Sequence, residues 1–324
     1  MALSIKTDIH THTLFSRHAY STLAENVAAA RAAGLELLGS SDHVSTMLFP
    51  EPHLRNFQFF TNQIIWPRTW DGVTLLRAAE VDIVSIEGRL FGQGVTCANN
   101  ITTESCSHGD TLFHRITRQL DYLVASVHDR AFACDASVAQ ATEMYLKVLA
   151  EPRVFVLGHT GRAGVPFDID TVLAAAKERH KLIEINEHSI EGDREGSTFD
   201  VCRRIAERCA ELGVGISVSS DAHMAYQIGQ FPSVKAMLEE IHFPQELIMN
   251  RDRETMLATL AAAGVCDLRD LAHVNAEGSA VRILDRLDLV PQAPSAPGYR
   301  IVHRPPALAE GLESPVDVPF QVAV

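Results

Sequence analysis

The stretch Ser197–Ser219, STFDVCRRIAERCAELGVGISVS, contains one complete helix–strand unit. Its apolar residues recur three or four positions apart, which places them on one face of a helix: Val201, Ile205, Cys209 and Leu212. Gly213 follows at the position where a glycine commonly ends a helix. The apolar run that comes next, 214–219, is typical of a short buried strand. The stretch therefore predicts a helix over residues 197–212 that leads into a strand.

The same alternation extends back to the N-terminus. Further strands are predicted over residues 4–9, 35–41, 74–84, 122–127, 154–158 and 182–186. Helices are predicted over residues 55–68, 112–119, 138–149 and 170–179, and an earlier helix begins at the capping-box sequence Thr22-Leu23-Ala24-Glu25 and ends before Gly34. Seven strands that alternate with helices predict an α/β fold in which a parallel sheet closes into a barrel. In such barrels the reactive residues lie at the C-terminal ends of the strands.

The length and composition of the chain predict one large domain with an extension. A chain of 324 residues, of which 46% are hydrophobic, suits this organisation. We predict a main domain over residues 1–270, with an aperiodic insertion at about residues 88–110, and a C-terminal extension over residues 271–324. Half of the 14 prolines follow residue 290, so a Pro-rich tail is predicted from about residue 291.

Charge and hydropathy restrict the class of partner. The formal net charge of −13 argues against a long nucleic-acid-binding surface, which normally needs a basic stripe. No apolar run approaches the ~18 residues that span a bilayer, and the N-terminal sequence has no signal-peptide pattern. The six cysteines include no close Cys-x-x-Cys pair, as expected for reduced thiols. These features predict a cytoplasmic protein without a membrane partner, and they leave homo-oligomer formation open.

Histidines and carboxylates stand at the ends of six of the seven predicted strands. They are His10 and His12 after the first strand, Asp42 and His43 after the second, Glu80 in the third, His128 and His159 after the fourth and fifth, and Asp221 and His223 after the seventh. His18 lies in the first loop, above the same face. Residues two apart on a strand point to the same side, so His10 and His12 should converge, as should Asp221 and His223. Imidazole and carboxylate groups are ligands that zinc, manganese and iron accept.

A single histidine at such a position is more often a satisfied core or surface residue than a metal ligand. Seven histidines and two carboxylates at one face are a different matter, because unrelated histidines would not recur so regularly at strand ends. Nine donors exceed what one tetrahedral ion takes, and they suffice for two or three ions that share a bridging carboxylate. The sequence therefore predicts a metal site with more than one ion at the C-terminal end of the barrel.

Seven short motifs follow one another along the chain: Asp8-Ile9-His10-Thr11-His12, His18-Ala19-Tyr20-Ser21-Thr22, Ser41-Asp42-His43, Ile65-Trp66-Pro67-Arg68, Asp71-Gly72-Val73, Leu182-Ile183-Glu184-Ile185-Asn186 and Ser220-Asp221-Ala222-His223. Together they resemble the PHP (polymerase and histidinol phosphatase) family, and in particular its short stand-alone bacterial phosphatase branch. The likeness covers roughly residues 3 to 265 and leaves out the insertion and the tail. It implies a distorted seven-stranded (β/α)7 barrel, which is TIM-like and of the PHP type, with a trinuclear metal site.

The resemblance also implies how nine residues divide among the ions. A first ion would be held by His10, His12, Glu80 and Asp221. Glu80 would bridge to a second ion held by His128 and His159, and a third would be held by His18, His43 and His223. All nine positions carry the residue type that the family requires. The cofactor expected here is two to three divalent ions, with zinc as the first choice and manganese or iron as alternatives, because all three accept these ligands.

A metal-bound hydroxide held by Glu80, Asp221, His10 and His12 is the expected nucleophile at such a site, because a bound ion lowers the pKa of water from 15.7 towards ~7. Four residues near the strand ends are candidates for binding the substrate phosphate: Arg17, Arg130, Arg162 and Asn186. The planar fork of arginine matches phosphate oxygens. The alternatives are surface arginines that bind nothing and a purely structural role for Asn186 in a turn.

These observations predict a metal-dependent phosphoesterase, a phosphoric ester hydrolase that acts on a small phosphorylated metabolite. Two enzyme alternatives stay open. One is a phosphodiesterase or nuclease, which the acidic chain disfavours, and the other is an amidohydrolase-like enzyme that acts on carbonyl substrates. A non-catalytic metal-binding module is a third alternative, and the complete set of ligands argues against it.

Overall fold

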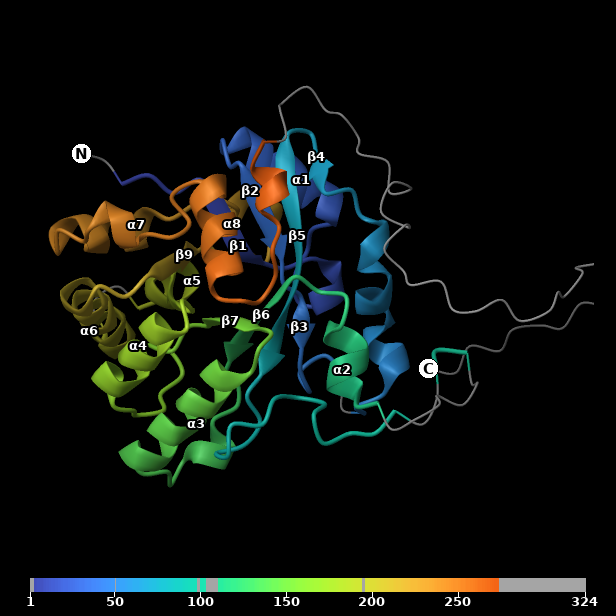
Figure 1. The fold of residues 1–324 in the computed structure, drawn as a ribbon, viewed down its shortest axis with the longest axis horizontal. Coiled ribbons are helices and arrows are strands. Elements are labelled where there is room, and N and C mark those ends of the chain that lie inside the picture. Colours follow the sequence, from blue (N-terminus) through green and yellow to red (C-terminus); the bar gives the residue numbers. More distant parts are fainter. Residues whose placement is uncertain (1–2, 50, 98–99, 103–109, 194–195, 274–324) are drawn as a thin grey trace, which may run out of the picture. The chain divides into compact units, whose positions relative to one another are not determined.

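Seven parallel strands form the centre of the protein (Figure 1). The computed structural model describes residues 3–49, 51–97, 100–102, 110–193 and 196–273. In spatial order the strands are β1 (Thr7–Thr11), β2 (Leu37–Ser40), β5 (Val73–Asp82), β6 (Tyr122–Ser126), β7 (Val154–Leu157), β8 (Leu182–Asn186) and β9 (Ile216–Ser219). Each strand pairs in parallel with the next. This order follows the chain, as the alternation of strands and helices predicts.

The first and last strands approach each other and nearly close the sheet into a barrel. A parallel bridge joins Thr11 to Ala222. Backbone hydrogen bonds run from the N–H of Asp221 to His10 O (3.0 Å) and from the N–H of His12 to Ala222 O (2.9 Å). The predicted fold class, an α/β barrel of seven parallel strands, is confirmed. The same contacts place residues near position 10 beside residues near position 221.

Strand β5 is the longest and gives the barrel its irregular shape. Its first half pairs with β2, and its second half pairs with β6 and with the short strand β3 (His43–Val44), in which His43 lies opposite Glu80. A second short strand, β4 (Thr69–Trp70), pairs with β5 in the antiparallel direction. Neither β3 nor β4 is predicted by the sequence pattern, because two residues are too few to show a period.

Helices surround the strands. The α-helices are α1 (Leu23–Ala32), α2 (Leu112–Thr117), α3 (Val138–Ala150), α4 (Ile169–Glu178), α5 (Glu187–Glu191), α6 (Ser197–Leu212), α7 (Pro232–Glu240) and α8 (Arg253–Ala262). The 3-10 helices are η1 (Leu14–Ser16), η2 (Leu54–Ile65), η3 (Ala131–Ala133), η4 (Ala225–Gln227), η5 (Gln245–Leu247) and η6 (Arg269–His273). The predicted capping box of α1 is present, and the N–H of Glu25 bonds to Thr22 Oγ1. Gly213 ends α6 in the left-handed conformation, as predicted.

Several predicted bounds shift by one or two residues, and two predicted elements differ more than that from the structure. The segment predicted as a helix over 55–68 is the 3-10 helix η2, interrupted at Phe57, whose φ of −118° is not helical. Phe57 and Phe60 are buried, so side-chain packing rather than α-helical hydrogen bonding sets this conformation. The first strand runs from Thr7 to Thr11 instead of over residues 4–9, and Thr11 still pairs with Ser40. His10 is therefore part of the strand rather than of the loop after it.

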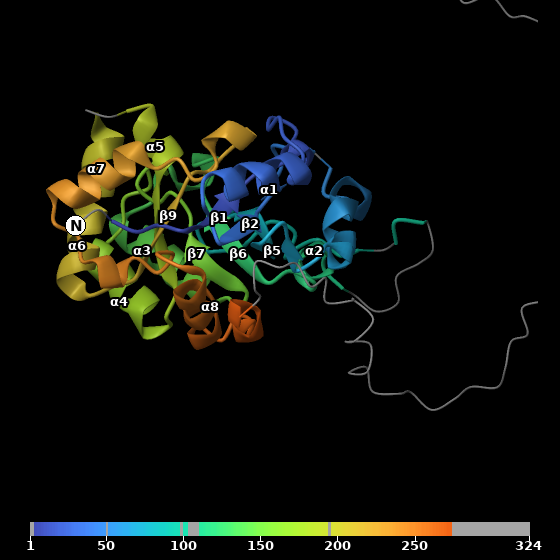
Figure 2. The same ribbon diagram turned by 90° about the horizontal axis from the view of Figure 1, so that it is seen from above.

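The interior of the barrel is apolar at one end and polar at the other. Tyr122 fills the apolar part and donates a hydrogen bond to Ile9 O at 2.6 Å. Helix α8 covers this end, where Met256, Leu257 and Leu260 belong to the same apolar cluster as Ile9. Figure 2 shows α8 on one side of the barrel and α5, which follows the C-terminal end of β8, on the other. The C-terminal ends of the strands are thus free to carry the polar residues.

The predicted insertion lies partly within the described residues. Leu90 and Phe91 are buried in the core, and Thr96 bridges to Thr111. Residues 98–99 and 103–109 lie outside the described part. The predicted domain boundary at residue 270 falls within η6, where Leu271 is buried, and residues 274–324 with the Pro-rich tail also lie outside it. Among the residues that the structure describes, no helix is long and apolar enough to cross a membrane.

Candidate metal centre

Four donor atoms meet at the junction of β1, β5 and β9. Nε2 of His10 lies 3.3 Å from Glu80 Oε2 and 3.6 Å from Asp221 Oδ1. Nε2 of His12 lies 3.6 Å and 3.0 Å from the same two oxygens. All four side chains are buried. Tetrahedral ligands at about 2.0–2.1 Å from an ion lie roughly 3.3 Å from one another, so these spacings suit a common ion.

Glu80 stands between two groups of histidines. Its Oε2 faces His10 and His12, and it also lies 2.8 Å from Nδ1 of His43. Its Oε1 lies 2.8 Å from Nε2 of His159 and 3.3 Å from Nε2 of His128. One carboxylate thus reaches both groups through different oxygens. This is the arrangement that a carboxylate bridging two ions requires.

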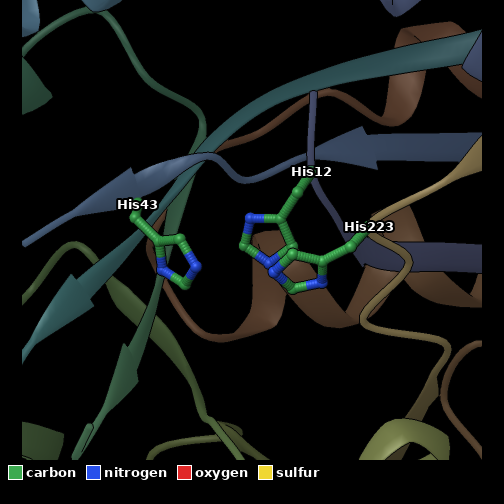
Figure 3. A group of neighbouring side chains, drawn as sticks. All are labelled: His12, His43 and His223. Atoms are coloured by element: carbon green, nitrogen blue, oxygen red, sulfur yellow. The ribbon is translucent and has the colours of Figure 1, made fainter. Parts of the chain in front are cut away.

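A third group of imidazoles lies nearer the surface. Ligand atoms of His12, His43 and His223 all lie within 4.8 Å of one another. Figure 3 shows these three rings, which come from the residue after β1, from β3 and from the loop after β9. Nε2 of His18 lies 2.9 Å from Nε2 of His223, and His18 is exposed. His43 also belongs to a second group of possible metal ligands, together with Glu80 and His128. It therefore connects the two groups.

Several donor atoms in this region have no hydrogen-bond partner within the described protein. They are His10 Nε2, both ring nitrogens of His43, Glu80 Oε2 and His159 Nδ1. Buried polar atoms are normally paired, because each unpaired one costs about 1–3 kcal/mol. Three of these atoms are close enough to share an ion, because Glu80 Oε2 lies 3.3 Å from His10 Nε2 and 2.8 Å from His43 Nδ1. The donor set is therefore of the right chemistry and spacing for divalent ions.

A second layer of carboxylates holds the far sides of these rings. Glu184 Oε1 lies 2.7 Å from Nδ1 of His10, and Asp82 Oδ1 lies 2.7 Å from Nδ1 of His128. Nδ1 of His12 lies 3.0 Å from Ser16 Oγ, which in turn donates to Asp42 at 2.7 Å. In metal sites such contacts fix the ring so that Nε2 points to the ion.

Sequence reasoning assigned no site role to Glu184 or Asp82. The signal was present in part, because Glu184 lies two residues before Asn186 on one strand and therefore on the same face. Asp82 has the same relationship to Glu80. The sequence pattern does not show which histidine each carboxylate contacts. Each carboxylate meets a histidine from a different strand, and that depends on the order of strands in the barrel.

Electrostatics keeps the carboxylates ionised in this buried setting. Burial by itself would raise the pKa of Glu80, but His128, His10 and His43 lower it well below its usual value. Burial would likewise lower the pKa of His10, and the carboxylates of Glu184, Glu80 and Asp221 raise it well above. The pKa of His18 falls to about 4, because partial burial and the neighbouring His43 and His223 disfavour its charge. His18 is thus neutral at pH 7, the form of imidazole that binds a metal.

Two of the four predicted phosphate-binding residues lie at the centre. The Arg162 guanidinium lies 3.7 Å from Asp221 Oδ2, with 34% of its side chain exposed. Asn186 is buried and points its Nδ2 to Glu184 Oε2 (3.2 Å) and Asp221 Oδ2 (3.3 Å). Its Oδ1 accepts hydrogen bonds from Ser189 at the start of α5, so Asn186 also has the structural role.

The other two predicted arginines have partners elsewhere. Arg17 donates to Leu48 O at 2.5 Å, and its guanidinium lies over the ring of Phe49 at 4.8 Å. Arg130 packs against Gly164, where an added Cβ would lie 2.3 Å from Nη1. Their proposed contact with phosphate stays a prediction.

Comparison with known proteins gives a consistent set of relatives. The chain is 37% identical over 257 residues to a probable phosphatase of Clostridium acetobutylicum, an alignment that covers 79% of this chain and 95% of the relative. A probable phosphatase of Photobacterium profundum is 36% identical over 267 residues, with 82% of this chain and 98% of that protein covered. The chain belongs to the family of these probable phosphatases. The predicted enzyme class, a phosphoric ester hydrolase, is thereby confirmed at the level of the reaction type.

No family model matches the chain. Among solved structures, the histidinol phosphate phosphatase of Lactococcus lactis, in complex with zinc, L-histidinol and phosphate, aligns with a TM-score of 0.45 at 15% identity. That alignment covers 74% of this chain and 94% of the other.

Proposed function

We propose that the protein is a PHP-type, metal-dependent phosphatase that releases phosphate from a small phosphorylated metabolite. The observation that carries the proposal is the position of Glu80, which offers one oxygen to His10 and His12 and the other to His128 and His159. The names of the relatives, which are probable phosphatases, support the choice of a phosphate ester over a carbonyl substrate.

Nine residues would hold two to three divalent ions: His10, His12, His18, His43, Glu80, His128, His159, Asp221 and His223. Zinc is the first choice among the ions, because imidazole with carboxylate is its usual set of ligands. We propose the division that the resemblance implies: His10, His12, Glu80 and Asp221 at a first ion, Glu80, His128 and His159 at a second, and His18, His43 and His223 at a third. Bound ions would supply Lewis-acid chemistry, which activates water and neutralises phosphate oxygens.

The remaining work falls to the residues of the protein. Arg162 is placed to hold a phosphate oxygen, because its guanidinium reaches the edge of the donor group and is still one third exposed. Asn186 lies beside it and keeps Asp221 in place through Nδ2. A small phosphate group could approach the ions beside His128 and His223, whose side chains are partly exposed.

The test combines metal analysis with an ester screen. We expect two to three equivalents of zinc, manganese or iron per chain and release of inorganic phosphate from phosphate monoesters. His10→Ala and Asp221→Ala should abolish release and lower the ion content. His114→Ala is the matched control, because this exposed histidine pairs with Asp110 on the surface, and it should keep both.

The same screen separates the alternatives. A metal-loaded protein that releases no phosphate from a broad panel of monoesters would overturn the proposal. Cleavage of diesters or of single-stranded DNA in place of monoesters would identify a phosphodiesterase or nuclease. Hydrolysis of amides or lactones alone would identify an amidohydrolase-like enzyme.

A further inference from the structure

Glu184 is a buried carboxylate whose acceptor sites are fully used by four polar groups. It lies on β8 and is 3% exposed. Its Oε1 contacts Nδ1 of His10 at 2.7 Å and also accepts from Ser219 Oγ. Its Oε2 accepts from the backbone N–H of His159 at 2.6 Å and from Asn186 Nδ2 at 3.2 Å. Four donors from four segments of the chain therefore meet on one side chain.

The contact with His10 decides which ring nitrogen faces the donor group. A carboxylate can only accept a hydrogen bond, so Nδ1 of His10 must carry the proton in this contact. Nε2 is then left without a proton when the ring is neutral, and it is the atom that lies 3.3 Å from Glu80 Oε2 and 3.6 Å from Asp221 Oδ1. Glu184 thus selects the tautomer in which His10 can bind an ion.

The contact with His159 acts on the backbone instead of on the ring. His159 has φ of +27°, a conformation that L residues rarely adopt, and its backbone N–H is held by Glu184 Oε2. This turn at the end of β7 directs the ring so that Nε2 lies 2.8 Å from Glu80 Oε1. His10 and His159 face different oxygens of the Glu80 carboxylate, Oε2 and Oε1 respectively.

We propose that Glu184 is a positioning residue that couples two ion positions, by fixing the tautomer of His10 on one side of Glu80 and the backbone turn of His159 on the other. The inference rests on the proposed function for the presence of ions, and it adds a residue outside the nine ligands. Glu184 itself touches neither substrate nor ion in this role.

An amide cannot replace this carboxylate without losing contacts on one side. The side chain that Glu184→Gln introduces has one oxygen and one NH2 group. With the oxygen toward His10 and Ser219, the NH2 group would face two further donors, the N–H of His159 and Nδ2 of Asn186. With the amide turned around, the His10 contact would be lost instead. In either orientation the amide loses contacts at one ion position. We expect the other ion position to be weakened as well, because the hydrogen bonds around the side chain are disturbed. The volume of the side chain is nearly unchanged.

Asp82 offers a matched control for this substitution. It contacts Nδ1 of His128 at 2.7 Å through Oδ1, as Glu184 does with His10, and accepts from Ser45 Oγ through Oδ2. Asp82→Asn can keep the His128 contact, because the Ser45 hydroxyl can rotate and accept from the new NH2 group. Among the residues described here, this carboxylate contacts one of the nine ligand side chains only. Both variants replace a carboxylate by an amide, but Glu184 contacts residues at two ion positions and Asp82 contacts a residue at one.

The experiment measures ion binding and ring chemistry together with activity. The full-length protein, its Glu184→Gln variant and its Asp82→Asn variant are stripped with a chelator and titrated with zinc by calorimetry. We expect Glu184→Gln to weaken zinc binding by roughly 10–100-fold at two positions, and kcat to fall without a matching change in KM. Asp82→Asn should affect one position at most. Weakening at only one position, or none, in Glu184→Gln would overturn the proposal.

A second measurement does not depend on a variant that folds. In ¹⁵N spectra of the histidine rings of the zinc-loaded wild-type protein, His10 should carry its proton on Nδ1. A proton on Nε2, or zinc bound through Nδ1, would overturn the proposal. Absence of phosphatase activity in wild-type protein that binds zinc normally would instead contradict the proposed function alone, so the two failures are distinguishable.

Discussion

The guanidinium of Arg162 lies 3.7 Å from the carboxylate of Asp221, which also lies 3.0 Å from Nε2 of His12. Asp221 therefore divides its two oxygens, with Oδ1 toward the histidines and Oδ2 toward Arg162 and Asn186. The positive charge of Arg162 therefore lies next to the donor group, on the side of Asp221 that faces away from the histidines. We expect a phosphate oxygen of the substrate to share this cation with Asp221.

Replacing Arg162 should weaken the binding of phosphate and leave the fold intact. We expect Arg162→Met to raise KM for phosphate esters and the inhibition constant of inorganic phosphate by roughly 10–100-fold, since a hydrogen bond to a charged group contributes about 1.5–3 kcal/mol. Arg162→Lys should recover part of the loss. Steady-state kinetics with phosphate as inhibitor checks this. Arg203→Met serves as control, because Arg203 pairs with Glu207 and Glu240 on α6 and α7. An unchanged inhibition constant in Arg162→Met would contradict the expectation.

Removing the ions should lower the thermal stability of the protein. Without them, buried atoms such as His10 Nε2 and Glu80 Oε2 lack partners. A ligand at 100 times its dissociation constant adds about 2.7 kcal/mol to the free energy of unfolding. We expect the Tm to fall on chelation and to return when zinc is added, as measured by differential scanning calorimetry. His10→Ala should show a smaller fall. Equal Tm values with and without chelator would show that ions do not bind here.

Adding one methyl group at Gly39 should destabilise the apolar end of the barrel. A Cβ there would lie 2.0 Å from Tyr122 Oη and 3.0 Å from Ile9 Cα. We expect Gly39→Ala to lower the free energy of unfolding by about 1–3 kcal/mol or more, because the overpacked core must shift. Urea unfolding measures it. Adding Tyr122→Phe should restore part of the loss, since that hydroxyl is the closest atom.

Gly192→Ala is the matched glycine control. Nothing lies within 4 Å of its added Cβ, and its φ of −78° suits any residue. Its free energy of unfolding should stay within about 0.5 kcal/mol of the wild-type value, as is usual for surface substitutions. A similar loss in both variants would mean that the Tyr122 contact is not the cause.

Replacing Asn250 by aspartate should loosen the seam between β1 and β9. Asn250 Nδ2 donates to Thr7 O (2.8 Å) and Val218 O (2.6 Å), and its Oδ1 accepts from the N–H of Val218 (2.9 Å). An aspartate cannot donate, so two buried carbonyls would face a carboxylate, at a cost of about 1–3 kcal/mol for each unpaired group. Chemical unfolding measures the loss. Asn56→Asp, at an exposed contact with Glu51 O, should have little effect.

Much of the fold could be predicted because its signals are local. Strand β8 was predicted with the bounds that the structure has, and α6 was as well, since apolar periodicity and Gly213 mark its face and its end. The failures have local causes too. The two residues of β3 show no period, and η2 takes its 3-10 form from the burial of Phe57 and Phe60.

The candidate site was predictable as a set of residue types and less so as a set of contacts. His10, His12, Glu80 and Asp221 come together as the strand-end rule predicts. The role of Glu184 could not be predicted, because its partners come from β1, from the end of β7 and from β9. A pattern along one strand does not show which strands become its neighbours across the barrel. The phosphate contact of Arg17 stays a prediction, and its guanidinium donates to Leu48 O in the structure.

The closing contacts between β1 and the segment after β9 have a consequence for the order of events during protein synthesis. His10 and His12 leave the ribosome early, whereas Asp221 and His223 follow about two hundred residues later. The N–H of His12 bonds to Ala222 O, between those two late residues, so the same event completes the barrel and the donor group. A nascent or truncated chain that stops before residue 221 would hold only a partial set of donors. Tight capture of ions should therefore begin only when the barrel is finished, which makes ion retention a reporter of completed folding.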